Sequence, residues 1–343
     1  MAHRAEIGVC VIGAGRAGMI HAVNFAGNVP GARLLAIVDP VEDAARTACG
    51  ELGISLSYRG YEQALENKAI DAYIIAVPTI FHKDIAVAAA LAGKHILCEK
   101  PMAMTVAECD DMIAASEKGG GVLQIGFMRR FDQSYARAKE ILDSGAVGDV
   151  VMVRSNTRGP SVPQPWMYDI RKSNGPLAEV NSHDIDTLRW FTGSEFSSVY
   201  AVGGNFRSVQ IKEEYPDFYD NVIVAASFKN GMQGMIDGAQ GVGYAYDARV
   251  EILGTKGCVF IGRLEGDSVL TCSAQNGFGS YPLVASWRQL FKDAYLREDI
   301  AFIEAISRQR PPKVGGHDGK MAVGVVDAGN RSILEKRIVY LDE

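Results

Sequence analysis

The first 39 residues contain a pattern that few folds accommodate. Residues 6–12 form a nearly continuous apolar run, which is typical of a strand buried on both faces of a parallel sheet. The motif Gly-x-Gly-x-x-Gly follows at residues 13–18 and leads into a predicted helix. A second apolar run, residues 33–38, ends at Asp39. The order of strand, glycine-rich turn, helix, strand and acidic residue predicts a βαβ unit that binds a dinucleotide.

The three glycines of this motif have separate roles. Gly13 allows a tight turn, Gly15 lets a pyrophosphate approach the backbone, and Gly18 lets the helix pack on the strand. The start of the helix adds unpaired N–H groups that attract phosphate charge. The predicted phosphate-binding residues are therefore Gly13, Ala14, Gly15, Arg16 and Ala17.

Asp39 indicates which dinucleotide is bound. It lies about 20 residues beyond the last glycine, where a carboxylate takes the ribose hydroxyls of NAD. Pro40, Val41 and Glu42 follow, so no basic residue stands ready for a 2′-phosphate. The sequence favours NAD over NADP, with a cap or turn carboxylate as the other interpretation of Asp39.

The alternation of strands and helices continues to residue 127. Apolar runs at residues 71–77, 95–99 and 122–127 alternate with helical patterns, among them residues 83–92 and 105–118. This alternation predicts an α/β Rossmann domain with a doubly wound parallel sheet over residues 1–127.

The pattern changes in the second half. Short alternating runs separated by turn residues extend from about Ser198 to Thr271 and predict antiparallel strands of one open sheet. We expect an α+β domain over residues 128–343, in which the last strand or helix packs back on the first domain.

Lys100 stands at a defined place in this scheme. The run at residues 95–99 ends in Glu99, and Pro101 follows Lys100 and restricts its backbone to extended geometry. The carboxyl end of a parallel strand faces the ligand crevice. Taken alone, Lys100 also fits a solvated lysine at a strand end.

A second group of polar residues follows Gly175-Pro176, where we expect one continuous helix through Trp190. Glu179 and His183 are four residues apart, which places them on one face of that helix. Asp186 is one turn beyond His183 and would set the tautomer of the imidazole from behind. The alternative is a solvated Glu–His pair of little energetic weight.

Composition excludes several classes of function. Apolar residues make up 48% of the chain and charged residues 22%, with a net charge of −6, which disfavours a nucleic-acid or membrane partner. No apolar run is long enough to span a bilayer. The six cysteines contain no CxxC pair and indicate reduced thiols and a cytoplasmic location. Histidine spacings typical of metal sites are absent, so we expect no bound metal.

These motifs together resemble the Gfo/Idh/MocA family, which comprises glucose–fructose oxidoreductase, inositol dehydrogenases and rhizopine-catabolism proteins. The resemblance extends through the whole chain, and Glu-Lys-Pro is its most specific mark. The residues that carry it are Gly13 to Gly18, Asp39, Val77-Pro78-Thr79 with His82, Glu99-Lys100-Pro101 and Gly126-Phe127-Met128-Arg129-Arg130-Phe131.

The resemblance implies a set of site residues. It makes Lys100, His183 and Glu179 catalytic, although family members more often carry aspartate at the position of Glu179. It leaves open whether Lys100 or His183 accepts the proton. It adds cofactor contacts at Val77, Pro78, Thr79, His82, Glu99, Lys100 and Arg129. It implies substrate contacts at Lys100, Arg129, Arg158, Trp166, Glu179 and His183.

The resemblance also implies an activity. It predicts an NAD-dependent oxidoreductase that acts on a ring hydroxyl or ketone of a cyclitol or sugar, most closely an inositol 2-dehydrogenase. The alternatives are a sugar 1- or 3-dehydrogenase or keto-sugar reductase, a redox-neutral NAD-dependent enzyme acting on glycosides, and a non-catalytic NAD(H) sensor. The family also implies a homo-oligomer, dimer or tetramer, formed through the second-domain sheet.

Overall fold

The computed structural model describes residues 6–273 and 278–341. The chain divides into two compact units. The first contains Met1–Phe131 and Asp293–Val323, and the second contains Asp132–Lys292 and Gly324–Glu343. The expected domain boundary after residue 127 stays a prediction.

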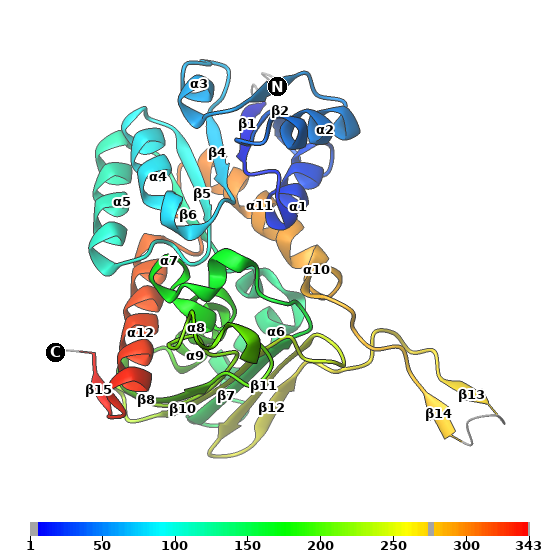
Figure 1. Cartoon of the computed structure of the whole chain (residues 1–343), viewed down its shortest axis with the longest axis vertical. Helices are drawn as coiled ribbons and strands as arrows, with labels where there is room; N and C mark the ends of the chain where they lie inside the picture. Colours follow the sequence, from blue (N-terminus) through cyan, green and yellow to red (C-terminus); the bar gives the residue numbers. More distant parts are fainter. Residues whose placement is uncertain (1–5, 274–277, 342–343) are drawn as a thin grey trace. The chain divides into compact units, whose positions relative to one another are not determined.

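The first unit is built on a six-stranded parallel sheet, as predicted (Figure 1). The strand order is β3-β2-β1-β4-β5-β6, which is the Rossmann order with its reversal between β1 and β4. The strands are β1 (Ile7–Ile12), β2 (Ala32–Val38), β3 (Leu56–Tyr58), β4 (Ala72–Ile75), β5 (His95–Glu99) and β6 (Leu123–Gly126). The helices are α1 (Arg16–Phe25), α2 (Glu42–Leu52), α3 (Tyr61–Leu65), α4 (His82–Leu91), α5 (Val106–Gly119), α11 (Lys292–Ser307) and the start of α12 (Gly316–Glu335).

The core of this unit explains why a distant segment belongs to it. Val9, Val11 and Ile74 have no exposed surface and pack in one cluster with Phe25 of α1 and Phe302 of α11. The aromatic ring that α11 contributes removes a large apolar area from water. Helix α11 is therefore part of the first unit's core, although almost 170 residues separate it from β6.

The register of the sheet brings three strand ends together. Ile12 of β1 is paired with Ile75 of β4, and Ile75 is paired with Cys98 of β5. Because the strands are parallel, the loops that follow them leave from one edge of the sheet. These loops carry the glycine motif, Val77 and Lys100.

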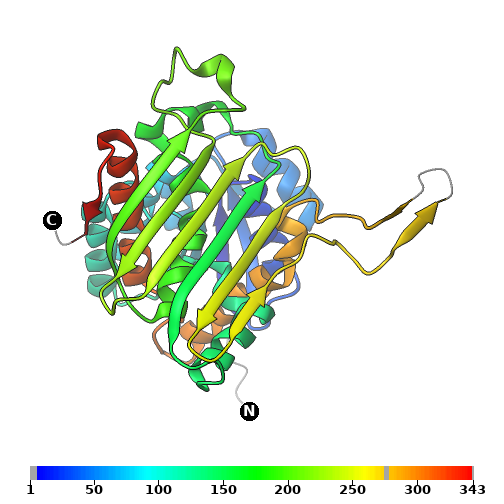
Figure 2. The same cartoon turned by 90° about the horizontal axis from the view of Figure 1, so that it is seen from below.

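The second unit contains a seven-stranded sheet in the order β12-β11-β7-β10-β9-β8-β15, which Figure 2 shows face on. Its strands are β7 (Val150–Gly159), β8 (Phe196–Gly204), β9 (Asn221–Phe228), β10 (Gln233–Gln240), β11 (Asp247–Gly254), β12 (Cys258–Ile261) and β15 (Val339–Tyr340). Its longer helices are α6 (Gln133–Asp143), α9 (Ser182–Thr192) and the end of α12, with short turns α7 (Ile170–Ser173), α8 (Gly175–Glu179) and α10 (Trp287–Leu290).

The prediction of a mainly antiparallel open sheet is confirmed, with two corrections. Strands β7 and β10 pair in parallel, whereas β11 pairs with the other side of β7 in the antiparallel direction. The run at residues 268–271 does not join this sheet. Instead, β13 (Thr271–Ser273) pairs with β14 (Phe278–Ser280) in a separate two-stranded ribbon that extends away from the sheet in both views (Figures 1 and 2).

Helix α9 packs on one face of this sheet. Along β7 the buried side chains of Ser155 and Thr157 both donate hydrogen bonds to Asp184 of α9, whose carboxylate is fully buried. The alternate residues of β7 point to the opposite face, as the period of a strand requires. Figure 2 views the sheet from this second face, which the unit's own helices leave uncovered.

The predicted continuous helix from Gly175 to Trp190 is wrong, because the chain forms two helices. Helix α8 ends at Glu179 and α9 begins at Ser182. The amide Nδ2 of Asn181 donates to the Asp184 carboxylate at 2.7 Å, a local side-chain bond that competes with helix continuation. Glu179 and His183 therefore do not share one face of a continuous helix.

Candidate functional site

The glycine motif forms the turn that the sequence predicts. Gly13 has a φ of 103°, in the left-handed region, and its N–H donates to the carbonyl of Val38 at 2.7 Å. A Cβ on Gly18 would lie 1.8 Å from the carbonyl oxygen of Gly13, so only glycine permits this contact between helix and turn. The turn is fixed by β2 on one side and by α1 on the other.

The same turn leaves room for a phosphate. A Cβ placed on Gly15 would have no heavy atom within 4 Å, so the backbone there is open to a ligand. Gly15 is also the N-cap of α1, and no side chain caps that helix end. The first N–H groups of a helix without a cap are suited to a pyrophosphate. Gly15, Arg16 and Ala17 thus fit the diphosphate of a dinucleotide.

Asp39 stands beside this turn at the end of β2. Its carboxylate accepts hydrogen bonds from the backbone N–H of Ala14 and of Val41, each at 2.9 Å. The predicted ribose ligand therefore lies against the phosphate-binding turn. These bonds fix the orientation of the carboxylate, while its contact with a ribose stays a prediction.

The loop after β4 is held by a buried histidine. Nδ1 of His82 lies 2.9 Å from the carbonyl oxygen of Pro101, and Nε2 lies 2.8 Å from that of Val77. Burial lowers the pKa of His82 although both carbonyls favour its protonated form. His82 thus ties the loop that carries Val77 and Pro78 to the loop that carries Lys100. Thr79 is buried at the start of the short 3-10 helix Thr79–Phe81.

Lys100 lies where the sequence places it, directly after β5, and its side chain is half-buried. Its backbone N–H donates to Oε2 of Glu99 at 3.0 Å. The peptide bond between Lys100 and Pro101 is cis. Glu99 is 5% exposed, and its other carboxylate oxygen contacts His21. The predicted contact of Glu99 with the cofactor stays a prediction.

Two arginines follow β6 in the 3-10 helix Met128–Phe131. Arg129 is 1% exposed, an unusual degree of burial for a guanidinium. Its neighbour Arg130 pairs with Asp318 at 2.9 Å, and the ammonium of Lys313 donates to the carbonyl of Arg130. The segment is held on the first unit through Arg130, while the predicted cofactor and substrate contacts of Arg129 stay predictions.

In the second unit, His183 occupies the first turn of α9 and is 6% exposed, whereas Glu179 at the end of α8 is half-buried. The position of His183 is set by the next residue, because Asp184 accepts bonds from Ser155, Thr157 and Asn181. Buried carboxylates with three donors are rigid anchors. Asp184, which the sequence argument did not single out, fixes the turn that carries His183.

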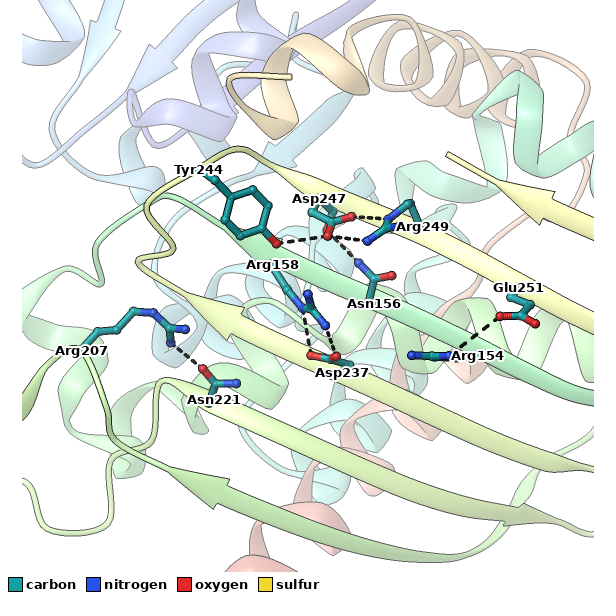
Figure 3. Close-up of polar contacts among 10 residues, drawn as sticks. All are labelled: Arg154, Asn156, Arg158, Arg207, Asn221, Asp237, Tyr244, Asp247, Arg249 and Glu251. Atoms are coloured by element: carbon teal, nitrogen blue, oxygen red, sulfur yellow. Dashed lines mark hydrogen bonds and ion pairs between the residues drawn. The ribbon is translucent and has the colours of Figure 1, made fainter. Parts of the chain in front are cut away.

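The structure does not bring Arg158 to the face that carries α9. Arg158 pairs with Asp237 on the open face of the sheet, near Tyr244 (Figure 3). The hydrogen bond to Asp237 raises the pKa of Arg158 further. Trp166 is half-buried in the 3-10 helix Pro165–Tyr168. The substrate contacts predicted for both residues stay predictions.

Sequence reasoning missed His21, which contacts Glu99, and Asp299, which contacts His21. The sequence does contain a pattern that points to His21, because this residue follows Gly18 by one helical turn and lies on the same buried face as Ala22 and Phe25. A histidine on such a face needs a polar partner. Nothing in the sequence identifies that partner as Asp299, since it is 278 residues away.

The described part of the chain contains neither a metal-binding cluster nor a membrane-spanning helix. Among residues 6–273 and 278–341, no group of three or more His, Cys, Asp or Glu is placed to hold a metal ion. In that same part of the chain, no helix has the length and apolar character needed to cross a membrane.

Comparison with known proteins gives matches over most of the chain. The profile of the GFO/IDH/MocA oxidoreductase family, described as an NAD-binding Rossmann fold, matches residues 7–127. The profile of the GFO/IDH/MocA C-terminal domain matches residues 135–260.

Individual relatives are similar over nearly their full length. Myo-inositol 2-dehydrogenase of Thermotoga maritima is 36% identical over 335 residues, which cover 97% of this chain and 98% of the relative. The NAD⁺-dependent scyllo-inositol 2-dehydrogenase of Bacillus subtilis is 34% identical, with 98% and 97% covered. The crystal structure of scyllo-inositol dehydrogenase from Lactobacillus casei with bound NAD(H) and scyllo-inositol superposes with a TM-score of 0.89 at 26% identity, covering 98% of this chain and all of that one.

Replacing Asp39 tests the cofactor site. We expect Asp39→Asn to weaken NAD binding by about tenfold, the value of one charged hydrogen bond, and to weaken NADP binding much less, because the carboxylate that repels a 2′-phosphate is gone. Isothermal titration with each nucleotide measures both constants. Asp43→Asn, an exposed carboxylate on α2, is the matched control. An unchanged ratio of the two affinities would remove Asp39 from coenzyme selection.

Proposed function

Because the chain belongs to the Gfo/Idh/MocA oxidoreductase family, we propose that it is an NAD-dependent dehydrogenase that oxidises a ring hydroxyl of inositol. The observation that carries the proposal is similarity to inositol 2-dehydrogenases over nearly the whole length of both chains. The Rossmann unit with its open glycine turn is consistent with it.

The cofactor supplies the redox chemistry. When bound, NAD⁺ accepts the hydride that leaves the hydroxyl-bearing carbon. Gly15, Arg16 and Ala17 would hold its diphosphate through backbone N–H groups, and Asp39 would hold a ribose. The protein's remaining task is to bind the ring, remove the hydroxyl proton and exclude water.

We assign the proton and charge chemistry to Lys100 and His183. In this assignment an imidazole nitrogen of His183 takes the hydroxyl proton, since histidine is the side chain that most often transfers protons near neutral pH. The ammonium of Lys100 donates a hydrogen bond to the same oxygen and stabilises its developing negative charge. Glu179 orients the histidine or the ring. The reverse assignment, with Lys100 as the proton acceptor, is the alternative.

We further propose that the chain forms a homo-oligomer through the open face of the second-unit sheet. This face exposes Val202, Ile223 and Phe260, at 55%, 50% and 70%. Its charged side chains are paired among themselves, as Arg158 with Asp237, Arg249 with Asp247 and Arg154 with Glu251 (Figure 3). A sheet face whose charges are paired and whose apolar side chains are exposed is suited to pack against the same face of a second copy of the chain. Sedimentation equilibrium tests this, and a monomer at micromolar concentration would contradict it.

A cytoplasmic location is also part of the proposal. All six cysteines are free thiols in the described structure, and four of them are buried. Such usage is typical of a reducing compartment. Cell fractionation tests the location, and recovery of the enzyme from an extracellular fraction would contradict it.

A substrate panel tests the proposed activity. Myo-inositol, scyllo-inositol and glucose are each incubated with NAD⁺ and, in parallel, with NADP⁺, and reduced nicotinamide is followed by absorbance. We expect one NADH per ketone formed, with a cyclitol preferred and NAD⁺ favoured. Product without net NADH would instead indicate the redox-neutral class, and binding without turnover would indicate a sensor.

Replacing the lysine tests its assigned role. Lys100→Ala should lower kcat by roughly 10³-fold or more, because the charge that stabilises the alkoxide is lost, while the Kd for NAD changes little. Lys68→Ala, an exposed lysine of the same unit, is the control. Turnover of Lys100→Ala near the wild-type rate would exclude Lys100 from the chemistry.

A further inference from the structure

A row of buried ionisable groups ends at the backbone of Lys100. Nδ1 of His21 lies 2.7 Å from Oδ1 of Asp299, and Nε2 of His21 lies 3.2 Å from Oε1 of Glu99. Oε2 of Glu99 accepts the backbone N–H of Lys100 at 3.0 Å. Asn24 completes the group by donating Nδ2 to the other oxygen of Asp299 at 2.8 Å. The row joins α1, α11 and β5 within the first unit.

The group is sealed from water. His21 and Asp299 have no exposed surface, and Glu99 has 5%. The rings of His21 and Tyr295 of α11 form a T-shaped contact, with ring centroids 5.5 Å apart. Unpaired charges at this depth would be costly, so the two carboxylates and the imidazole depend on one another.

The protonation states follow from this arrangement. Burial alone would lower the pKa of His21, but Asp299 and Glu99 outweigh it and raise the pKa well above its ordinary value. Burial alone would raise the pKa of Glu99, but His21 and the charge of Lys100 lower it. Both carboxylates therefore favour the imidazolium form of His21, in which each ring nitrogen donates to one of them. Burial raises the pKa of Asp299, although His21 and Asn24 oppose this.

We propose that His21 and Asp299 are positioning residues for the reaction, because they hold the Glu99 carboxylate that fixes the backbone of Lys100. The proposal rests on the proposed function only in taking Lys100 as the catalytic lysine. None of the three groups needs to touch substrate or cofactor for this role.

The packing leaves Glu99 little freedom. A Cβ placed on Gly126 of β6 would lie 3.1 Å from Cα, Cδ and Oε2 of Glu99, so the neighbouring strand closes off that side. Both carboxylate oxygens are used, one by His21 and one by the N–H of Lys100. On the far side of Lys100, His82 lies against the carbonyl of Pro101. The backbone of the lysine is thus held before and after the residue.

The arrangement also links helix α11 to the lysine. Asp299 lies in the segment Asp293–Val323, which belongs to the first unit but follows residues 132–292 of the second unit in the sequence. Asp299 of that segment raises the pKa of His21, and His21 contacts the Glu99 carboxylate that accepts the Lys100 N–H. A small displacement of a catalytic group costs about 100-fold in rate, which is the effect that this linkage prevents.

The principal test replaces Asp299 with asparagine, which can still bond Asn24 and His21 but lacks the charge. We expect kcat to fall by about 10- to 100-fold, while KM and the Kd for NAD stay as in the wild type. Without Asp299 the pKa of His21 falls, so the imidazolium is lost as the pH rises through a lower value. The alkaline limb of the kcat profile should therefore move to lower pH. Asp293→Asn, an exposed carboxylate on α11, is the control.

Combining variants separates this inference from the proposed function. If Asp299 acts through Lys100, Asp299→Asn should cause no further loss of kcat in a Lys100→Ala background. The same fold loss in both backgrounds would overturn the positioning role and leave the proposed function intact. Full turnover of Lys100→Ala would contradict the assigned role of the lysine and, with it, the inference.

A second variant and a spectroscopic measurement keep the inference testable if Asp299→Asn fails to fold. Glu99→Gln keeps an acceptor for the Lys100 N–H but loses the ion pair with His21, and it should give the same alkaline shift. In the wild-type protein, nitrogen NMR of labelled histidine should show His21 with both ring nitrogens protonated at pH 8. A His21 that titrates near its ordinary pKa would overturn the inference.

Discussion

The parallel register of β1, β4 and β5 is the constraint on which the rest of the first unit depends. It places Ile12, Ile75 and Cys98 side by side, so the glycine turn, the Val77 loop and Lys100 leave from one edge. A shift of one residue in β5 would turn the Glu99 side chain away from His21 and onto the other face of the sheet. The contact between Glu99 and His21 therefore forms only when β5 has this register.

The two units contribute different kinds of chemistry. The first provides backbone N–H groups, the Asp39 carboxylate and the ammonium of Lys100, which suit a dinucleotide and a developing negative charge. The second provides an imidazole whose helix start is anchored by Asp184. In both units a buried carboxylate adjoins the residue proposed for catalysis, Glu99 before Lys100 and Asp184 after His183. Rigid support of this kind is what catalytic geometry requires.

The sequence predicted the parts of the fold that have local signatures. Buried runs such as residues 6–12, the glycine turn and the helix expected at residues 105–118 all appear as predicted, because each depends on neighbouring residues alone. The helix break at Asn181 escaped prediction because it depends on a side-chain bond to Asp184 and on the space above Gly238, where a Cβ would lie 2.1 Å from Asn181. Arg158 and Asp299 show the same limit, since the partner of each comes from a strand or helix that no local pattern identifies.

Transfer of deuterium from substrate to coenzyme tests the central claim most directly. The enzyme is incubated with NAD⁺ and inositol deuterated at its ring carbons, and the mass of the reduced coenzyme is measured. We expect one deuterium on the nicotinamide ring of each NADH and a slower turnover than with unlabelled inositol. In a separate incubation with unlabelled inositol in deuterated water, the nicotinamide ring should gain no deuterium. Ketone or rearranged product without deuterated NADH would contradict direct hydride transfer to NAD and the dehydrogenase assignment.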